Sequence, residues 1–597
     1  METRTGAYHW CTPALSCLRA GRPERHPRGI EMNGRPSRQT FALRQRPLAL
    51  CLACALGIGT TSSVSAANSG SPNSANDFAR PLAPRIRAPR ITGPADLPAE
   101  SPLREAWEQR LANPPPPRPA ATIPVTNCND SGAGSLRDAM SAAVDGDTID
   151  MTALTCSTIT LTTGGLGTGV SNLSIDGPGS KYLAIDANNA SGALYHSGTG
   201  TLNISGVTIE NGAKYNNSPR GGCIFSLGNV ALNGVIVQDC SVTTHPGYTY
   251  PALGGGIYAT GNVYLDNDSI VTGSDALSSD AGAYGGGIFA GGQVGLSYSV
   301  VSHNTAQSVG PSFGALGGGV YSGTSTVLTG ASVEYNGAYG KYSSTFADGG
   351  GIYSKTALTS IYGNVSGNTV YSDGNLAVGG GAFVASGGGT IKYSTIADNE
   401  SNHNIGGIVM VGSSGTLNIF NSTISGNKAA NAVGGLYTGM ATNVYNSTIA
   451  FNYEGSTGSY SYVSSAGLSA YNAPVALQSS ILAGNYAQSA GKYIDLSGSS
   501  GTTVSGANNL VVGTLIAVPG DTILQTDPQL LPLAYNGGPT RTHALGPFSP
   551  ALDAGNNTNG FNYDQRGDGF PRVVGANADI GAFEGVSPDV IFANGFD

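Results

Sequence analysis

The feature that most constrains this chain is a series of glycine triplets, each followed by an apolar residue and then an aromatic ring. The five copies are Gly254–Tyr258, Gly285–Phe289, Gly317–Tyr321, Gly349–Tyr353 and Gly379–Phe383, and shorter copies begin at Gly406, Gly434 and Gly467. They recur about every 25–33 residues, a period typical of solenoids and repeat arrays. Because glycine alone combines an easy positive φ with room for another backbone, we expect each triplet to form a tight turn.

A column of asparagines repeats in step with the glycines, and each asparagine lies three residues after an apolar position. Its members are Asn304, Asn336, Asn368, Asn399, Asn427, Asn452 and Asn485. Asparagine tolerates the left-handed conformation, and its amide can bond to an identical amide in the next repeat. We therefore expect these residues to stack in a turn as an amide ladder.

Short runs of alternating apolar and polar residues fill the space between these marks, for example at 416–420 and 443–449. They are typical of half-buried strands, and no run of helical periodicity interrupts them. Strands this short cannot bury an apolar face alone, so successive repeats must stack on one another. The sequence predicts an all-β fold, a parallel β-helix solenoid over 124–520, with an N-terminal helical cap and a small C-terminal domain.

An aromatic column accompanies the glycine triplets and is the candidate binding face. Its residues are Tyr258, Phe289, Tyr321, Tyr353, Phe383 and Tyr437. Alternation along each strand places these rings outward if the preceding apolar residues point inward. Two interpretations remain open, namely a platform for sugar rings and mutual aromatic stacking that only stabilises the solenoid.

The pairing of Gly-Gly-apolar with apolar-x-x-Asn resembles the repeats of polymorphic outer membrane proteins and of related bacterial proteins with a pectate-lyase-like β-helix. The resemblance covers roughly residues 124–510 and implies a right-handed solenoid. The chain departs from the outer membrane group at its end, which lacks the series of ten-residue alternating strands that a membrane barrel needs. A self-anchoring autotransporter is therefore not expected.

The N-terminal region has the composition of an export leader. Residues 1–66 hold an extension in which Met32 is a candidate start, followed by a basic region, the apolar stretch 48–59 and a small-residue cleavage site at 64–66. The Pro-rich residues 67–123 are expected to form a linker or a removable segment. We predict an exported protein, located outside the cell or on its surface, with no integral membrane span in the mature chain.

Four cysteines remain after the predicted cleavage, namely Cys128, Cys156, Cys223 and Cys240. In an exported chain they are expected to form disulfides, and proximity favours Cys128–Cys156 and Cys223–Cys240. A serine followed by apolar helical spacing within 132–140 predicts a short helix that covers the open end of the first turn.

The C-terminal region breaks the repeat. Its successive motifs at 536–540, 549–555, 564–567 and 579–584 resemble the choice-of-anchor Q domain of bacterial surface proteins. The resemblance covers about 65 residues, assigned to 521–586, and it implies a surface location but no reaction. Two interpretations of Asp564 and Asp568 remain open, a calcium site built from oxygen ligands or a polar turn. Residues 587–597 form a separate tail, for which two interpretations remain open, a sorting or docking signal and a disordered end.

The charge of the chain argues against nucleic-acid binding. The formal net charge is −9, and no arginine occurs between Gly221 and Thr540, so the solenoid has no basic track for nucleic acid. We expect an extended, non-catalytic binding face for a polysaccharide or another surface protein, with no cofactor. One alternative is a polysaccharide lyase or glycoside hydrolase, for which Asp266 and Asp268 form the closest acid pair in the repeats. A structural stalk without ligand is a further alternative.

Overall fold

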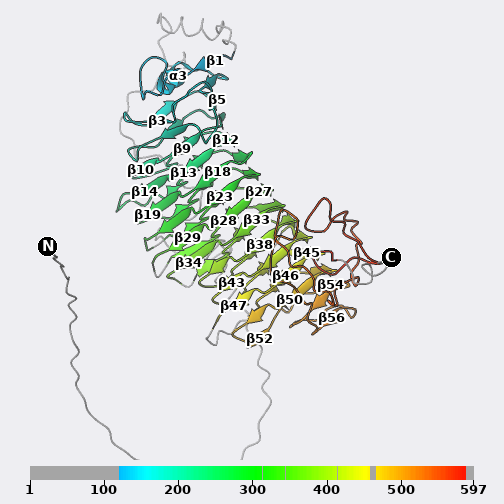
Figure 1. Ribbon diagram of the computed structural model, residues 1–597. Coiled ribbons are helices and arrows are strands. Elements are labelled where there is room, and N and C mark those ends of the chain that lie inside the picture. The colour runs from blue at the N-terminus through cyan, green and yellow to red at the C-terminus, as the bar shows by residue number, and fades with distance from the viewer. Residues whose placement is uncertain are drawn as a thin grey trace, which may run out of the picture. The chain divides into compact units, whose positions relative to one another are not determined.

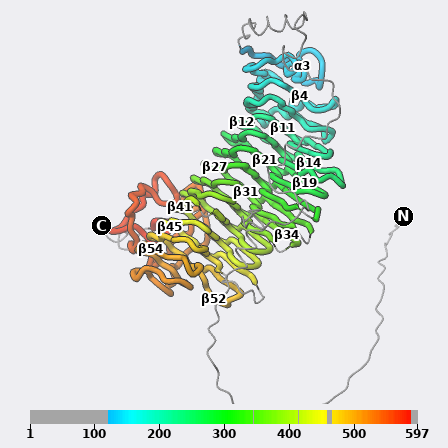
Figure 2. The backbone as a smooth tube through the Cα atoms, turned by 180° about the vertical axis from the view of Figure 1, so that it is seen from behind, coloured from blue at the N-terminus to red at the C-terminus, as the bar shows by residue number. Residues whose placement is uncertain are grey.

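The structure is a computed structural model that describes residues 120–311, 313–342, 345–374, 376–412, 414–456 and 465–585. The predicted leader, nearly all of the Pro-rich segment and the tail lie outside these residues. The described chain forms a parallel β-helix of about 13 turns. Successive turns lie one above another in Figures 1 and 2. The predicted all-β solenoid is therefore confirmed.

Each full turn visits up to five sheets, which we number in the order that the chain meets them. In the described residues, sheets 1 to 5 contain 14, 14, 11, 5 and 12 strands. Neighbouring strands pair in parallel except for the last pair of sheet 3, β51 and β52, which is antiparallel. Parallel pairing between successive turns is what a solenoid requires, because every turn repeats the same chain direction.

Sheets 1 and 2 contain the longest series of strands. The strands of sheet 1 are β1 (Thr122–Pro124), β2 (Thr148–Asp150), β5 (Leu173–Asp176), β8 (Thr201–Ser205), β12 (Asn229–Asn233), β17 (Val263–Asp266), β22 (Val294–Ser297), β27 (Ser325–Thr329), β32 (Ala357–Ile361), β37 (Gly389–Lys392), β41 (Thr416–Phe420), β45 (Ala441–Tyr445), β49 (Val475–Gln478) and β54 (Val504–Ala507). The strands of sheet 2 are β3 (Thr158–Thr160), β6 (Ala184–Asp186), β9 (Thr208–Glu210), β13 (Ile236–Gln238), β18 (Ile270–Thr272), β23 (Val300–Ser302), β28 (Ser332–Glu334), β33 (Asn364–Ser366), β38 (Thr395–Ala397), β42 (Thr423–Ser425), β46 (Thr448–Ala450), β50 (Ile481–Ala483), β55 (Leu510–Val511) and β56 (Ile523–Leu524).

Sheets 3 to 5 complete the turns. The strands of sheet 3 are β10 (Ala213–Asn216), β14 (Ser241–Thr244), β19 (Asp275–Ser278), β24 (Thr305–Ser308), β29 (Gly337–Gly340), β34 (Thr369–Ser372), β39 (Glu400–Ser401), β43 (Lys428–Ala429), β47 (Tyr453–Glu454), β51 (Tyr486–Ala487) and β52 (Lys492–Tyr493). The strands of sheet 4 are β15 (Ala252–Leu253), β20 (Ala283–Tyr284), β25 (Ala315–Leu316), β30 (Phe346–Asp348) and β35 (Leu376–Val378). The strands of sheet 5 are β4 (Leu166–Thr168), β7 (Leu194–His196), β11 (Ile224–Ser226), β16 (Ile257–Ala259), β21 (Ile288–Ala290), β26 (Val320–Ser322), β31 (Ile352–Ser354), β36 (Ala382–Val384), β40 (Ile408–Met410), β44 (Leu436–Thr438), β48 (Leu468–Ala470) and β53 (Leu496–Gly498).

The main core lies between sheets 1, 2 and 5, and it follows from strand alternation. Ile257, Leu265 and Val271, one from each of these sheets in a single turn, are fully buried and belong to one continuous apolar cluster. The aromatic residue that follows Ile257 and its equivalents does not belong to this cluster, as expected for side chains that point alternately to opposite faces of a strand. The predicted inward and outward assignment of the glycine-following residues is therefore confirmed.

A second, narrower core lies between sheets 3 and 4. It contains two valines and a series of alanines that are fully buried, namely Val242, Ala252, Ala276, Ala283, Ala306, Ala315, Ala338, Ala347, Val370 and Ala377. Because alanine carries only a methyl group, the two sheets pack closely. The chain then returns from sheet 4 to sheet 5 through the glycine triplets.

The glycines and asparagines perform the predicted roles. Gly254 has a φ of 63° and Gly285 a φ of 64°, a region that favours glycine. A Cβ on Gly255 would clash with backbone atoms of Gly286 and Asp275. The asparagines form a continuous ladder from Asn304 to Asn485, in which each Nδ2 donates to Oδ1 of the next asparagine at 2.7–3.0 Å.

The predicted cap and disulfides are also present. Helix α3 (Leu136–Ala142) begins after Ser135, whose hydroxyl accepts a hydrogen bond from the Asp138 backbone N–H at 3.2 Å. Leu136 and Met140 of this helix pack into the main core, at the end of the stack where Figure 1 shows α3 beside β1. Disulfides join Cys128 to Cys156 and Cys223 to Cys240, with Cα atoms 6.5 and 5.5 Å apart.

Residues 526–585, which we call the C-terminal segment, pack on the outer face of sheet 2. Thr395 in β38 donates to the Arg541 carbonyl at 2.6 Å, and the Ala582 N–H donates to Thr448 Oγ1 in β46 at 3.1 Å. The whole of strands β38, β42, β46 and β50 is buried, whereas β13 and β18 are buried only on their inner side. The C-terminal segment therefore closes this face at the later turns only. In the part of the chain that the structure describes, no helix has the length and apolarity of a membrane span.

Candidate functional site

The aromatic column on sheet 5 is a continuous stack of seven rings, which we call the aromatic ladder. Its members are Tyr195, Phe225, Tyr258, Phe289, Tyr321, Tyr353 and Phe383, one from each of β7, β11, β16, β21, β26, β31 and β36. Neighbouring ring centroids are 4.7–5.4 Å apart, and neighbouring planes are within 14° of parallel. In-register parallel strands place identical positions one above another, so the rings stack face to face.

Mutual stacking, one of the two interpretations of this column, is what the ring geometry shows. The faces of the internal rings are filled by neighbouring rings, and Tyr258 and Phe383 are only 5% and 1% exposed. Phe289, Tyr321 and Tyr353 are half-buried. A sugar ring needs an open aromatic face, which the internal positions do not present.

Tyr437, the remaining predicted binding residue, lies outside the stack. Val409 separates it from Phe383 in the register of sheet 5. Tyr437 is 4% exposed and packs in a small apolar cluster with Phe383 and Val433. The structure therefore brings five of the six predicted rings together and leaves Tyr437 apart.

A second column covers one side of the ladder. It contains one residue from each successive turn, which we call the corner column: Arg220, Leu253, Tyr284, Leu316, Asp348 and Val378. Two of its members contact ladder rings. The ring centroid of Tyr284 lies 5.6 Å from that of Tyr321, and the Arg220 guanidinium lies 5.3 Å from the ring centroid of Tyr258. Burial raises the pKa of Tyr284 to about 12. Tyr284 and Arg220 therefore cover part of one side of the ladder.

Asp348 is the one acidic residue of the corner column. The residue is 1% exposed, and its Oδ1 has no hydrogen-bond partner among the described residues. Burial raises the pKa of Asp348 well above the ordinary aspartate value. Burial also raises the pKa of the neighbouring Tyr353 hydroxyl. The charge of Asp348 raises the same pKa by a smaller amount. An unpaired carboxyl group in such a position favours its neutral form.

The N-terminal end of the ladder is different, because its first ring has a free face. Tyr195 stacks on Phe225 with one face and is 48% exposed. On its other side, the paired residue in β4 is Gly167, which has no side chain. Within the described residues, this ring therefore presents the open aromatic face that the internal positions lack.

Two cations accompany the first rings of the ladder, and we call Lys214 and Arg220 the cation pair. Lys214 Nζ lies 5.2 Å from the centroid of Phe225, and the Arg220 guanidinium lies 5.3 Å from that of Tyr258. Lys214 donates to the Arg220 carbonyl at 3.0 Å, and Arg220 Nη1 donates to the Tyr258 hydroxyl at 3.3 Å. Burial lowers the pKa of Lys214 to about 8.

The charges of the cation pair are not neutralised by the protein in the described residues. The ion pairs there are Arg137–Asp130, Arg541–Asp398, Arg566–Asp564 and Arg572–Glu584, and none involves Lys214 or Arg220. The Nε atom of Arg220 is buried without a hydrogen-bond acceptor. A buried donor without an acceptor is costly.

Tyr195 and the cation pair were not predicted from the sequence, although part of the signal was present. Tyr195 and Phe225 follow Leu194 and Ile224, the same apolar-aromatic pairing that marks the later turns, but without a glycine triplet. Nothing in the spacing indicates that Lys214 and Arg220, which lie outside sheet 5, lean onto these rings. Their position depends on how the chain returns to β11.

The candidate acids of an enzyme are placed elsewhere. Asp266 ends β17, and Asp268 lies in the following turn with a φ of 60°. Both are exposed, and the structure gives their side chains no hydrogen bond or ion pair among the described residues. They lie on the turn between sheets 1 and 2, whereas the ladder lies on sheet 5. Their catalytic role stays a prediction.

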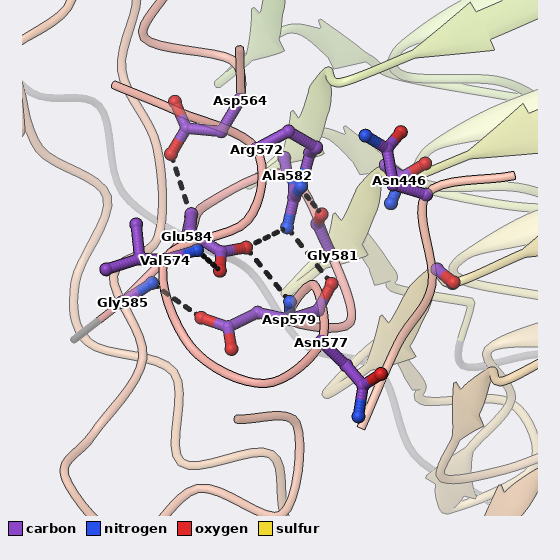
Figure 3. A network of polar contacts seen from close by, with 12 residues as sticks. Asn446, Asp564, Arg572, Val574, Asn577, Asp579, Gly581, Ala582, Glu584 and Gly585 are labelled. Atoms are coloured by element: carbon purple, nitrogen blue, oxygen red, sulfur yellow. Dashed lines mark hydrogen bonds and ion pairs between the residues drawn. The ribbon is translucent and has the colours of Figure 1, made fainter. Parts of the chain in front are cut away.

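The candidate calcium ligands lie in the C-terminal segment, and Asp564 belongs to the polar network of Figure 3. Asp564 accepts from Arg566 Nη2 at 2.6 Å and from the Glu584 N–H at 2.7 Å. Glu584 accepts in turn from Arg572 Nη2 at 2.8 Å, and burial raises the pKa of Glu584 to about 7. Within the described residues, no group of three or more His, Cys, Asp or Glu side chains is arranged to hold a metal. A calcium site at Asp564 and Asp568 stays a prediction.

Comparisons with known proteins add little beyond the fold. No protein-family model matches the chain, and no curated protein sequence matches it. The crystal structure of pectate lyase Pel9A is similar over 78% of this chain and 96% of its own, with 12% sequence identity and a TM-score of 0.29. The resemblance of residues 521–586 to a choice-of-anchor Q domain likewise stays a prediction.

Proposed function

We propose that the chain is an exported, surface-associated β-helix that binds carbohydrate without catalysis, and that Tyr195 is its principal contact. The observation that carries this proposal is the open face of Tyr195 at the end of a rigid stack of rings. A planar ring held in place by neighbours offers contact area at low conformational cost. The proposed binding face is the N-terminal end of the ladder, with the internal rings supporting it.

The export part of the proposal is supported by the two disulfides, which persist in oxidising compartments. The leader at 1–66 and the anchor-like character of 521–586 remain proposals from the sequence. Under this proposal the solenoid holds the sugar-binding end at a distance from the C-terminal segment. The C-terminal segment would then face the cell surface.

The proposal is tested by measuring binding of the full purified chain to a panel of immobilised polysaccharides. Tyr195→Ala should lose binding to whichever glycan the wild-type chain retains. The matched control is Tyr182→Ala, because Tyr182 is also exposed, at 69%, but is not part of the ladder. Equal binding by wild type and Tyr195→Ala would exclude this site, and no binding to any glycan would favour a structural stalk.

The same wells test the alternative of polysaccharide cleavage. Released reducing ends or unsaturated products, measured with and without calcium, would identify an enzyme. Asp266→Asn and Asp268→Asn would then show whether these acids participate. Binding without products supports the non-catalytic proposal.

A further inference from the structure

The free face of Tyr195 lies at the same end of the solenoid as the first described residues, because β1 and β4 begin sheets 1 and 5. The residues that precede Ala120 lie outside the described chain and include Trp107. An indole is a large planar group, and aromatic rings stack on one another in offset pairs. We propose that Trp107 docks on the free face of Tyr195, so that the Pro-rich segment of the same chain covers the N-terminal end of the ladder.

The glycine opposite Tyr195 leaves room for such a ring. Gly167 pairs with Tyr195 in register, and its φ is not positive. A Cβ at Gly167 would meet no atom closer than the Tyr195 carbonyl oxygen, at 4.0 Å. The fold therefore does not require glycine at this position. Glycine within a strand often marks a place where another group approaches closely, and here that group would lie over the Tyr195 ring.

The distance from Ala120 to Tyr195 can be bounded from printed contacts between successive turns. Ala120 packs beside Gly146, whose N–H donates to the Asn172 carbonyl at 2.8 Å. The Asn172 side chain accepts from the Thr201 N–H at 3.1 Å. Three turns at a strand spacing of about 4.8 Å give about 15 Å, and the six residues from Tyr195 to Thr201 span at most about 20 Å. The separation is therefore at most about 35 Å.

The tether between Trp107 and Ala120 is long enough for this separation. Trp107 precedes Ala120 by 13 residues, which span about 40 Å at the roughly 3.1 Å per residue of extended Pro-rich chains. Five of these residues are prolines, Pro114–Pro117 and Pro119. Prolines restrict the free tether, so docking orders it at a smaller entropic cost. The tether also raises the effective concentration of Trp107 at Tyr195.

Docking of Trp107 has a consequence for carbohydrate binding, and only this consequence rests on the proposed function. A sugar ring and the Trp107 indole need the same face of Tyr195, because Phe225 occupies the other face. The Pro-rich segment therefore competes with carbohydrate for the ladder. Removal of this segment, one of the two interpretations of residues 67–123, would free the binding face.

Fluorescence of Trp107 tests the docking in the full chain without any saccharide. The chain has two tryptophans, and Trp10→Phe leaves Trp107 as the only one. In this background we expect Trp107 to be quenched by acrylamide about threefold less than in the same background with Tyr195→Ala, because stacking shields the indole. Tyr182→Ala is the matched control. Tyr182 is exposed but lies outside the ladder, so its removal should leave the quenching unchanged.

A second variant fills the site and keeps Tyr195 in place. Gly167→Phe adds a ring at the position that pairs with Tyr195, where a Cβ meets no close contact. This ring should stack on Tyr195 and expel Trp107, so that acrylamide quenches Trp107 as strongly as in Tyr195→Ala. The result does not depend on deleting any part of the ladder.

Three results would overturn the inference. They are equal quenching of Trp107 with and without Tyr195→Ala, no effect of Gly167→Phe, and loss of the protection on dilution, which would assign the contact to a second copy of the chain. Saccharide binding that requires Tyr195, together with the first result, removes this inference and leaves the proposed function intact. Protection that requires Tyr195 in a chain that binds no saccharide has the opposite meaning.

Discussion

Thr423 in β42 donates a hydrogen bond of 2.6 Å to the side-chain oxygen of Gln565, although 142 residues separate them. The Gln565 amide nitrogen also donates to the Arg541 carbonyl at 3.0 Å, and both side chains are fully buried. A glutamine of the C-terminal segment thus occupies the outer face of sheet 2, beside the hydroxyls of successive turns. This contact ties the C-terminal segment to the solenoid.

Gln565→Ala should therefore loosen the C-terminal segment. The substitution leaves the buried Thr423 hydroxyl without its acceptor and removes one of two donors to the Arg541 carbonyl. We therefore expect a loss of about 2–4 kcal/mol in the free energy of local unfolding. Hydrogen exchange should rise in β38, β42 and β46, while the turns near α3 stay unchanged. Gln488→Ala is the control, since Gln488 is exposed. Equal exchange in the two variants would contradict this role.

Asp348 predicts a pH dependence of stability. In the unfolded chain it ionises at the ordinary pKa of about 3.9, whereas burial holds its pKa well above that value in the folded protein. The folded state therefore binds this proton more tightly, and the free energy of unfolding falls as pH rises past about 4.

Asp348→Asn removes this titration and should raise the melting temperature at pH 7 relative to wild type. The difference between the two proteins should shrink as the pH is lowered toward 4. Asp268→Asn is a suitable control, because Asp268 is exposed and asparagine tolerates its positive φ. A difference that is independent of pH would show that the carboxyl charge is not responsible.

The asparagine ladder predicts that shortening a single one of its side chains lowers the stability of the protein strongly. Asn368 Nδ2 donates to Asn399 Oδ1 at 3.0 Å, and Asn368 Oδ1 accepts from Asn336 Nδ2 at 3.0 Å. Asn368→Ala breaks the ladder on both sides and leaves buried donors unpaired, at a cost of about 3–5 kcal/mol. Urea denaturation measures this, with Asn443→Ala as a part-buried control that removes a single amide pair.

The ladder also predicts that internal and terminal rings differ in their effects. Tyr321→Ala removes a ring stacked on both faces and should cost about 3–4 kcal/mol in stability. Tyr195→Ala removes a half-exposed ring stacked on one face, with a cost of about 1 kcal/mol. Thermal denaturation of the two variants distinguishes these roles, and equal shifts would contradict a shared stack with one free end.

Several features of the candidate site could be predicted from the sequence. The aromatic column and its outward orientation follow from strand alternation after Ile257 and its equivalents, and both disulfide pairs follow from proximity. The side chains that cover the aromatic column could not be predicted from the sequence. Arg220 and Asp348 act on ladder rings from a neighbouring column, and the spacing of residues within one turn does not reveal this.

By itself, the sequence determined that this chain is a capped parallel solenoid with glycine turns and an asparagine ladder. These features recur at the same position in each repeat, so every repeat favours the same local structure. Parallel pairing in register then places the recurring residues one above another as a column. Tertiary structure alone decided which ring of the ladder stays open, where the cation pair lies and which turns the C-terminal segment covers. Those outcomes depend on contacts between residues such as Thr423 and Gln565 that are far apart in the chain and follow no period.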